Sequence, residues 1–363
     1  MPYDLYIRCI CTDQSSANRI LAMPLRTLLL SALTATTRFV PRRLCWAVIS
    51  TFLITLFVTL ALLWSRYGRF GLNVLWRRGG SYWSEIARDE PHHSLAILHA
   101  LSGAPPVLSP GSLHWTSRMA GFETAELPVE EAGSLIIGQI LLARIDPARF
   151  QFQVLNDPEG ALDLQGWMAR EKPVLVVNGS YYDDTGNPAT PLISGGRQLG
   201  PQSWQAQHGA FVTGSHGARI VDLKQISWQQ GFRGAQAGFV SYPLLIGPEG
   251  SVRTPSTPSW LADRSFIGQD RSGRILIGTT TTGALSLRRF ADFLMAAPLD
   301  LVLALNLDGG PLACQAVAAG PFRRDHCGDT EIAVHDGVLQ QLRQPWGQRW
   351  ALPIVLTVAA KGE

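Results

Sequence analysis

A polar segment directly follows an apolar run near residue 306, and its residue types could do chemistry. Residues 300–305 are predicted to form a buried strand that ends in Asn306, Leu307, Asp308 and two glycines. Because side chains two apart on a strand share a face, Asn306 and Asp308 are expected to point together. A carboxylate beside a carboxamide could bind a substrate and move a proton. The alternative is a plain Asp-Gly turn, as found in hairpins.

Two other segments combine similar residue types. The apolar run 174–177 leads into Asn178, a glycine, two tyrosines and the pair Asp183-Asp184. Further along, Arg264 and Asp270 stand six positions apart in front of another apolar run. A guanidinium group binds phosphate through two parallel hydrogen bonds, so the third segment could hold an anion. For the three aspartates, an ordinary loop or turn is the alternative interpretation.

The elements that would position these segments are mostly short strands. Strands are predicted over residues 134–145, 150–155, 174–177, 208–212, 239–246, 275–279, 300–305 and 351–359. Helices are predicted over residues 162–172 and 287–297, the second with Ser286 as its N-terminal cap. This pattern favours an α+β fold with a mixed, largely antiparallel twisted sheet and a few flanking helices.

One uncharged segment, residues 44–64, is long enough to cross a membrane. Its 21 residues would span about 31 Å as a helix, and no small-residue cleavage site follows it. Arginines flank both ends, so the positive-inside rule gives no orientation. Residues 1–78 carry a net charge of +8 and the remainder −5, a distribution that argues against a nucleic-acid binder. We therefore predict a single-pass membrane protein.

The chain is accordingly divided into four parts. A basic N-terminal segment covers residues 1–43, the transmembrane helix residues 44–64, a linker residues 65–112 and the main domain residues 113–363. Within the linker, residues 82–101 are compatible with a helix, which Pro91 would end or kink.

Two cysteines lie in the main domain, Cys314 and Cys327, on either side of a Gly-Pro turn. In an oxidising compartment they could form a disulfide across a hairpin-like loop, and the alternative is two unrelated thiols. No Cys/His spacing is typical of a zinc site.

Four motifs in order resemble the phosphodiester glycosidase family. Members of that family typically show Asn-Gly-x-Phe-Phe after a strand, a Pro-Leu segment, Arg-x-x-Ile-Gly-x-Asp-x-x-Gly and Asn-Leu-Asp-Gly-Gly. The corresponding segments here are residues 178–182, 242–245, 264–273 and 306–310, so the resemblance covers roughly residues 130–340. The chain departs from the pattern in two places: Tyr181-Tyr182 replaces the aromatic pair Phe-Phe, and Pro311-Leu312 follows the last motif where a small residue and a serine are usual.

The resemblance implies cleavage of a sugar from a phosphodiester, which we assign to the polar residues of these motifs. Asp308, Asn178 and Asp183 are expected to be catalytic, with Asp308 as the principal carboxylate. Substrate binding is expected from Arg264, Asn306, Gly309, Gly310, Asp270, Gly196 and Tyr182. Arg264 would hold the phosphate, and the glycine amides could approach it closely.

The sequence thus favours a membrane-anchored hydrolase that acts on a glycosyl phosphodiester of an extracytoplasmic, periplasmic glycan or glycoconjugate. The alternative is a non-catalytic glycan-binding or scaffold module in envelope polysaccharide assembly, which the Pro311-Leu312 departure motivates. A nuclease or phosphatase would need the His/Asp clusters of metal-dependent phosphoryl transfer, which the sequence lacks. No cofactor is required, although Asp308 with neighbouring carbonyls could ligate Ca²⁺ or Mg²⁺. The expected partners are a carbohydrate substrate and the membrane, and no nucleic acid.

Overall fold

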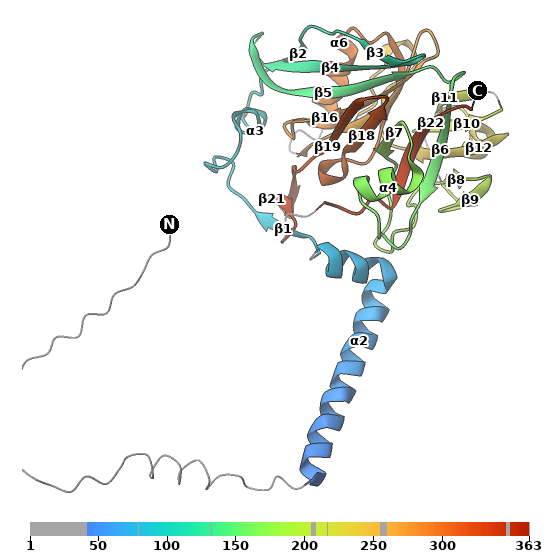
Figure 1. The fold of residues 1–363 in the computed structure, drawn as a ribbon. Coiled ribbons are helices and arrows are strands. Elements are labelled where there is room, and N and C mark those ends of the chain that lie inside the picture. The colour runs from blue at the N-terminus through green and yellow to red at the C-terminus, as the bar shows by residue number, and fades with distance from the viewer. Residues whose placement is uncertain are drawn as a thin grey trace, which may run out of the picture. The chain divides into compact units, whose positions relative to one another are not determined.

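The computed structural model describes residues 42–78, 80–131, 133–204, 208–215, 217–254, 260–345 and 349–362. Most of the basic segment expected over residues 1–43 lies outside these ranges. The sheets and short helices belong to one compact unit, Ala61–Glu363. Figure 1 shows its strands as packed layers with few helices around them. Every strand pairing in the described residues is antiparallel, which confirms the α+β fold with largely antiparallel sheets.

The first sheet holds the strand that ends in the Asn306 motif. Its strands follow the order β13-β17-β15-β16-β5-β4-β2, with β3 paired to β4. Their bounds are Leu244–Ile246 (β13), Leu301–Asn306 (β17), Ser265–Asp270 (β15), Ile275–Thr280 (β16), Leu135–Ile145 (β5), Phe122–Glu131 (β4), Leu108–Pro110 (β2) and Thr116–Met119 (β3). Asn306 pairs with Phe266, so the ends of β17 and β15 that carry Asn306 and Ser265 lie together.

The second sheet holds the strand that ends in Asn178. Its order is β19-β18-β7-β22-β6, and Figure 1 shows β18, β7, β22 and β6 side by side. The bounds are Phe322–Cys327 (β19), Cys314–Ala319 (β18), Leu175–Asn178 (β7), Ile354–Ala360 (β22) and Phe150–Asn156 (β6).

Two smaller sheets complete the unit. One has the order β11-β10-β12-β8-β9, with bounds Gly217–Asp222, Gly209–Gly214, Ala235–Ser241, Leu192–Ser194 and Arg197–Leu199. The other has the order β1-β21-β20-β14, with bounds Tyr82–Glu85, Val338–Arg343, Glu331–His335 and Leu261–Ala262. A shared core of buried side chains such as Phe122, Phe152, Phe211, Phe239 and Leu305 joins three of the four sheets.

Both predicted helices are present. Helix α6, Leu287–Ala296, starts at Ser286, whose hydroxyl accepts from the Arg289 amide, and buries Phe290, Phe293 and Leu294. Helix α4, Leu164–Glu171, is capped by Asp163 and buries Trp167. A short helix α5 covers Trp228–Gly231, and two 3₁₀ turns cover Pro248–Gly250 (η1) and Gly310–Leu312 (η2).

Two elements differ from the sequence prediction. The strand expected over residues 239–246 is two strands, β12 and β13, separated at Pro243, because proline has no amide hydrogen for a strand ladder. The helix expected over residues 82–101 is wrong in its first half, where Tyr82–Glu85 pairs with β21 as β1. Only α3, Leu95–Ala100, is helical, and it begins after the Ser94 cap.

A long helix, α2 (Arg42–Arg78), precedes the sheets. Its regular geometry is interrupted at Gly68, where φ is +58°. Positive φ is readily accessible to glycine, so the break falls where the sequence permits it. Within the described residues, Trp46–Arg77 is the one helical stretch long and apolar enough to cross a membrane by its length and composition.

Candidate active site

The segment after β17 is fixed to strands of two different sheets. The Leu307 amide donates to the Ser265 carbonyl at 3.0 Å, and the Asp308 amide donates to the Gly179 carbonyl at 3.1 Å. Asn178 Nδ2 donates to the Asp308 carbonyl at 2.7 Å. The Asp308 carboxyl accepts from the Gly309 amide at 2.9 Å. Asp308 therefore stands where the two sheets meet, with its backbone held on both sides.

Asn178 acts on the neighbouring backbone. It is 2% exposed, and its Oδ1 accepts from the Cys314 amide at 3.1 Å while its Nδ2 holds the Asp308 carbonyl. Both ends of the amide are thus used within the protein. The structure gives Asn178 the geometry of a positioning residue for the segment from Asp308 to Cys314.

Glu331 is a site residue that the sequence analysis missed. It lies at the start of β20, opposite Ala262 in the pairing of β14 with β20. Trp260 Nε1 donates to Glu331 Oε1 at 3.2 Å. Gly310, with φ +64°, has no room for a side chain, because a Cβ would overlap the Glu331 carboxylate. The close approach of Gly310 therefore brings the Asp308 segment against Glu331.

The carboxyl group of Glu331 acts electrostatically on that of Asp308. Burial and the neighbouring Glu331 raise the pKa of Asp308 from 3.8 to about 8. Burial also raises the pKa of Glu331, while Arg264 opposes that rise. Asp308 thus keeps its proton at neutral pH. Two titratable groups with different environments are the usual arrangement for an acid and a base.

A third acid, Asp263, is buried and has a structural position. Its Oδ2 accepts from the amides of Asp329 and Thr330, both at 3.1 Å, and its carbonyl accepts from the Gly310 amide at 2.8 Å. Burial raises its pKa to about 7. Asp263 therefore ties the segment that leads to Glu331 to the segment that follows Asp308.

Arg264 offers one end of its guanidinium group to the same region. The side chain is 5% exposed, with Nε donating to the Leu285 carbonyl and Nη2 to the Trp260 carbonyl, both at 3.0 Å. Nη1 has no hydrogen-bond partner among the described residues, and it lies 3.5 Å from where a Cβ of Gly309 would be. The guanidinium group of Arg264 is therefore held in place by two carbonyl groups, and its Nη1 remains available to a ligand.

Aromatic rings lie on another side of Asp308. Tyr181 and Tyr242 stack with ring centroids 4.3 Å apart, and the Tyr181 hydroxyl donates to the Tyr242 carbonyl at 2.7 Å. Asn306 Nδ2 donates to the Tyr181 hydroxyl at 2.7 Å, whereas its buried Oδ1 has no partner among the described residues. Burial, together with Asp308 and Glu331, raises the pKa of Tyr182. Tyr181, Tyr182 and Tyr242 therefore lie near Asp308 with their hydroxyl groups protonated.

Three residues expected at the site are engaged in turns of their own. Asp183 holds its own exposed turn by accepting from the Thr185 amide and hydroxyl and the Asn187 amide. Asp270 closes the turn after β15, at the opposite end of that strand from Arg264.

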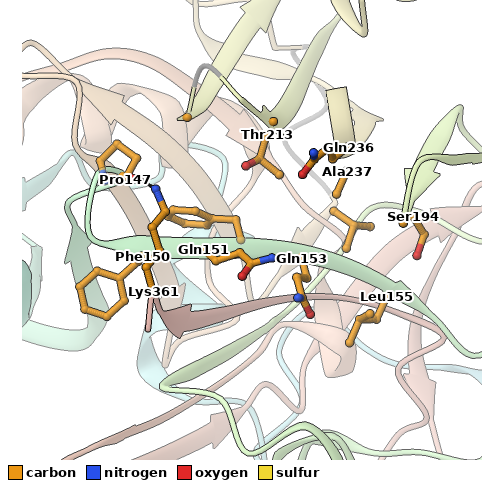
Figure 2. A pocket seen from close by; sticks show the side chains of 15 residues that line it. Pro147, Phe150, Gln151, Gln153, Leu155, Ser194, Thr213, Gln236, Ala237 and Lys361 are labelled. Atoms are coloured by element: carbon orange, nitrogen blue, oxygen red, sulfur yellow. Dashed lines mark hydrogen bonds between the residues drawn. The ribbon is translucent and has the colours of Figure 1, made fainter. Parts of the chain in front are cut away.

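The third, Gly196, lies in the hairpin between β8 and β9, where its amide donates to the Gln236 carbonyl at 2.7 Å. Beside this hairpin is a pocket of about 430 Å³ along β6 (Figure 2). Gln151, Gln153 and Gln236 line it, with Lys361 at one end. None of the carboxyl groups described above belongs to this pocket.

A disulfide joins the segments that carry the two acids. Cys314 and Cys327 pair directly across β18 and β19 and are bonded through sulfur. The Gly328 amide also donates to the Ala313 carbonyl at 2.9 Å. Pro311 is buried within η2, in the chain between Asp308 and Cys314. The disulfide and the Gly328–Ala313 hydrogen bond thus link the segment that follows Asp308 to the segment that precedes Glu331.

Metal coordination has little support from side chains. In the part of the chain that the structure describes, no group of three or more His, Cys, Asp or Glu residues could hold an ion.

A comparison with known protein families matches the part of the chain that carries the site. Residues 171–341 match the family model of the phosphodiester glycosidases, which confirms the resemblance seen in the four motifs. The matched segment contains Asn178, Arg264, Asp308 and Glu331.

Two solved structures are similar to this chain. The catalytic domain of zebrafish N-acetylglucosamine-1-phosphodiester alpha-N-acetylglucosaminidase, described as auto-inhibited by its pro-peptide, has 16% identity and a TM-score of 0.43. That alignment covers 78% of this chain and 90% of the zebrafish one. A hypothetical protein from Synechocystis has 15% identity and a TM-score of 0.46, over 69% and 64% of the two chains. No curated protein matches this chain in sequence.

Proposed function

We propose that this protein is a hydrolase that cleaves a glycosyl phosphodiester between the anomeric carbon and the phosphate oxygen. The observation that carries the proposal is the convergence of Asp308, Glu331 and the available Nη1 of Arg264 within the segment matched by the family model. Glycoside cleavage requires an acid and a base or nucleophile, and a phosphate leaving group requires a cation.

The two carboxyl groups suit different roles. Asp308, protonated at neutral pH, can donate a hydrogen bond to the phosphate and give its proton to the departing oxygen. Glu331, next to Arg264, can act as the base that activates water or as the nucleophile. Water supplies the hydroxyl group at the anomeric carbon, and the phosphate leaves as a monoester.

Arg264 and the tyrosines suit the two halves of the substrate. Arg264 would bind the phosphate through Nη1, because its other donors are already held by carbonyl groups. Tyr181 and Tyr242 belong to a cluster of aromatic rings next to Asp308, and aromatic rings are a surface that sugars can pack against. Asn306 Oδ1 is an acceptor that a sugar hydroxyl could satisfy.

The cellular setting is part of the proposal. The uncharged stretch that ends at Trp64, within the candidate helix Trp46–Arg77, would anchor the protein in a membrane. The disulfide between Cys314 and Cys327 supports an oxidising compartment such as the periplasm for the domain. The substrate would then be an extracytoplasmic glycan or glycoconjugate.

An activity screen of the full chain in detergent tests the proposal. Sugar-1-phosphodiesters that differ in the sugar are offered with and without a chelator, and free sugar is measured. We expect release by the wild type and loss of release in Asp308→Asn and Glu331→Gln. Asp183→Ala is the matched control, because this carboxylate only holds an exposed turn. Binding of glycans without any release of sugar would support the non-catalytic module instead.

A further inference from the structure

The segment that follows the apolar span is docked onto the catalytic domain. After the break at Gly68, the last turns of α2 place Phe70 against Gly160 and Gly186, where it is only 8% exposed. Both glycines have positive φ, and a Cβ on either would come within 2.6 Å of the Phe70 ring. They form a notch that only glycine can provide, and Phe70 fills it.

Polar contacts fix the same helix face. Asn73 Nδ2 donates to the Glu159 carbonyl at 2.8 Å, Arg77 Nη1 donates to the Ala161 carbonyl at 3.4 Å, and Arg69 pairs with the Glu159 carboxylate at 2.6 Å. The receiving loop is itself rigid, because Asp157 accepts from the amides of three of its residues. Residues 69–78 therefore form a helix that is packed on the domain and held by polar contacts.

The docked helix touches the candidate active site. The Phe70 ring meets Tyr182 edge-on, with centroids 5.6 Å apart. Tyr182 follows Asn178-Gly179, and the Gly179 carbonyl accepts from the Asp308 amide. One aromatic ring thus separates Phe70 from the part of the site where Asp308 and Glu331 lie.

Chain length then limits how far the site can be from a membrane. The uncharged span ends at Trp64, six residues before Phe70. Even a fully extended chain of that length reaches only about 20 Å. This limit holds for any arrangement of the helix that precedes Gly68.

The outer face of the docked helix fits a membrane surface. On the docked helix, Trp76 is 87% exposed and Leu75 44% exposed, and just before the break at Gly68 the side chains of Trp64 and Tyr67 are exposed as well. Arg66, next to Tyr67, is also exposed. Aromatic and basic side chains of this kind gather at the boundary between lipid and water.

From this docking we infer that the site takes a glycosyl phosphodiester carried by a lipid of the membrane in which the protein is anchored. The short connection keeps the site within reach of lipid headgroups and away from more distant glycans. The inference rests on the function proposed above. Water adds to the anomeric carbon, the bond from that carbon to the phosphate oxygen breaks, and the products are a free sugar and a lipid phosphate monoester.

The test uses the full chain in nanodiscs, where both leaflets are accessible. One substrate is N-acetylglucosamine-1-phosphate esterified to a long prenyl chain and incorporated in the same discs; the other is the methyl ester in solution. We expect the prenyl ester to be hydrolysed at least about tenfold faster at equal bulk concentration, because sharing a membrane raises the effective concentration. Equal rates would overturn the inference and leave the proposed function intact, whereas hydrolysis of neither ester calls for the same pair made with each sugar of the screen above, and no hydrolysis of any pair would remove both.

A spacer variant separates membrane proximity from simple affinity for an apolar chain. A helical EAAAK-type insertion of about 20 residues between Ser65 and Arg66 would lift the domain by about 30 Å without altering the docked helix. We expect it to slow cleavage of the prenyl ester about tenfold and to leave the methyl ester unaffected. A Gly/Ser insertion of equal length, which lets the domain return to the surface, should restore much of the rate. An unchanged prenyl rate with the helical spacer would contradict the inference.

Discussion

The substitution Asp308→Asn should abolish turnover and at the same time stabilise the fold, increasingly so as the pH rises. The folded protein holds the Asp308 proton up to about pH 8, whereas an unfolded chain releases it near the ordinary value of 3.8. Between these values the folded state binds more protons, so its stability falls as pH rises. Asparagine keeps the shape of the side chain and has no proton to release.

The magnitude follows from the size of the pKa shift. About four units at about 1.4 kcal/mol per unit set a ceiling of about 6 kcal/mol for the variant's advantage above pH 8. Asp308 is partly exposed, and solvent screening should reduce this to about 2–3 kcal/mol. Near pH 4 the advantage should be small, because at that pH, close to the unfolded pKa of 3.8, the unfolded wild type has released only part of its protons.

Urea unfolding of wild type and variant in detergent, at several pH values from about 4 to about 9, measures the difference. Glu331→Gln should show the same sign, because burial also raises the pKa of Glu331. A difference between Asp308→Asn and wild type that is the same at every pH would refute the assignment of a raised pKa. Near-normal sugar release by Asp308→Asn would refute its catalytic role.

Three further predictions concern the same site. The ratio kcat/KM should fall above about pH 8, as Asp308 loses its proton, and should fall on the acid side as Glu331 gains one; a rate that keeps rising beyond pH 9 would contradict this. Arg264→Lys should lower kcat/KM about 100-fold or more in steady-state assays, since an ammonium group cannot hold two carbonyls and a phosphate in the same geometry; a change below about threefold would contradict it. Replacing Cys314 and Cys327 by alanine should cost about 3 kcal/mol in unfolding experiments, as expected for a loop of this length; unchanged stability would show that the disulfide adds no constraint.

Local pattern predicted the strands that carry the site. The apolar runs before Asn178 and Asn306 are both buried strands, and Ser286 caps α6 as its residue type and position indicated. Tyr82–Glu85 was misassigned because its partner β21 lies more than 250 residues away, and only that pairing makes it a strand. Strand pairing over such separations leaves little trace in local sequence.

The site was predictable in part. Asp308 and Arg264 stand out because a polar or charged residue borders each apolar run. Glu331 could not be predicted from local sequence, because an acidic residue at the start of a strand is common. Only its contacts with Gly310 and Trp260, which are distant in sequence, place it at the candidate site. Asp270 matched a motif and yet closes a turn, because its oxygens are occupied by backbone amides and Arg274.

The central claim is that the bond broken joins the anomeric carbon to oxygen, which hydrolysis in oxygen-18 water tests directly. A glycosidase places the label on the released sugar, because water or its equivalent reaches the anomeric carbon. A phosphodiesterase would place it on the phosphate. We expect labelled sugar and unlabelled phosphate from a sugar-1-phosphodiester, with no turnover in Asp308→Asn. Labelled phosphate, or no hydrolysis of any sugar-1-phosphodiester, would contradict it.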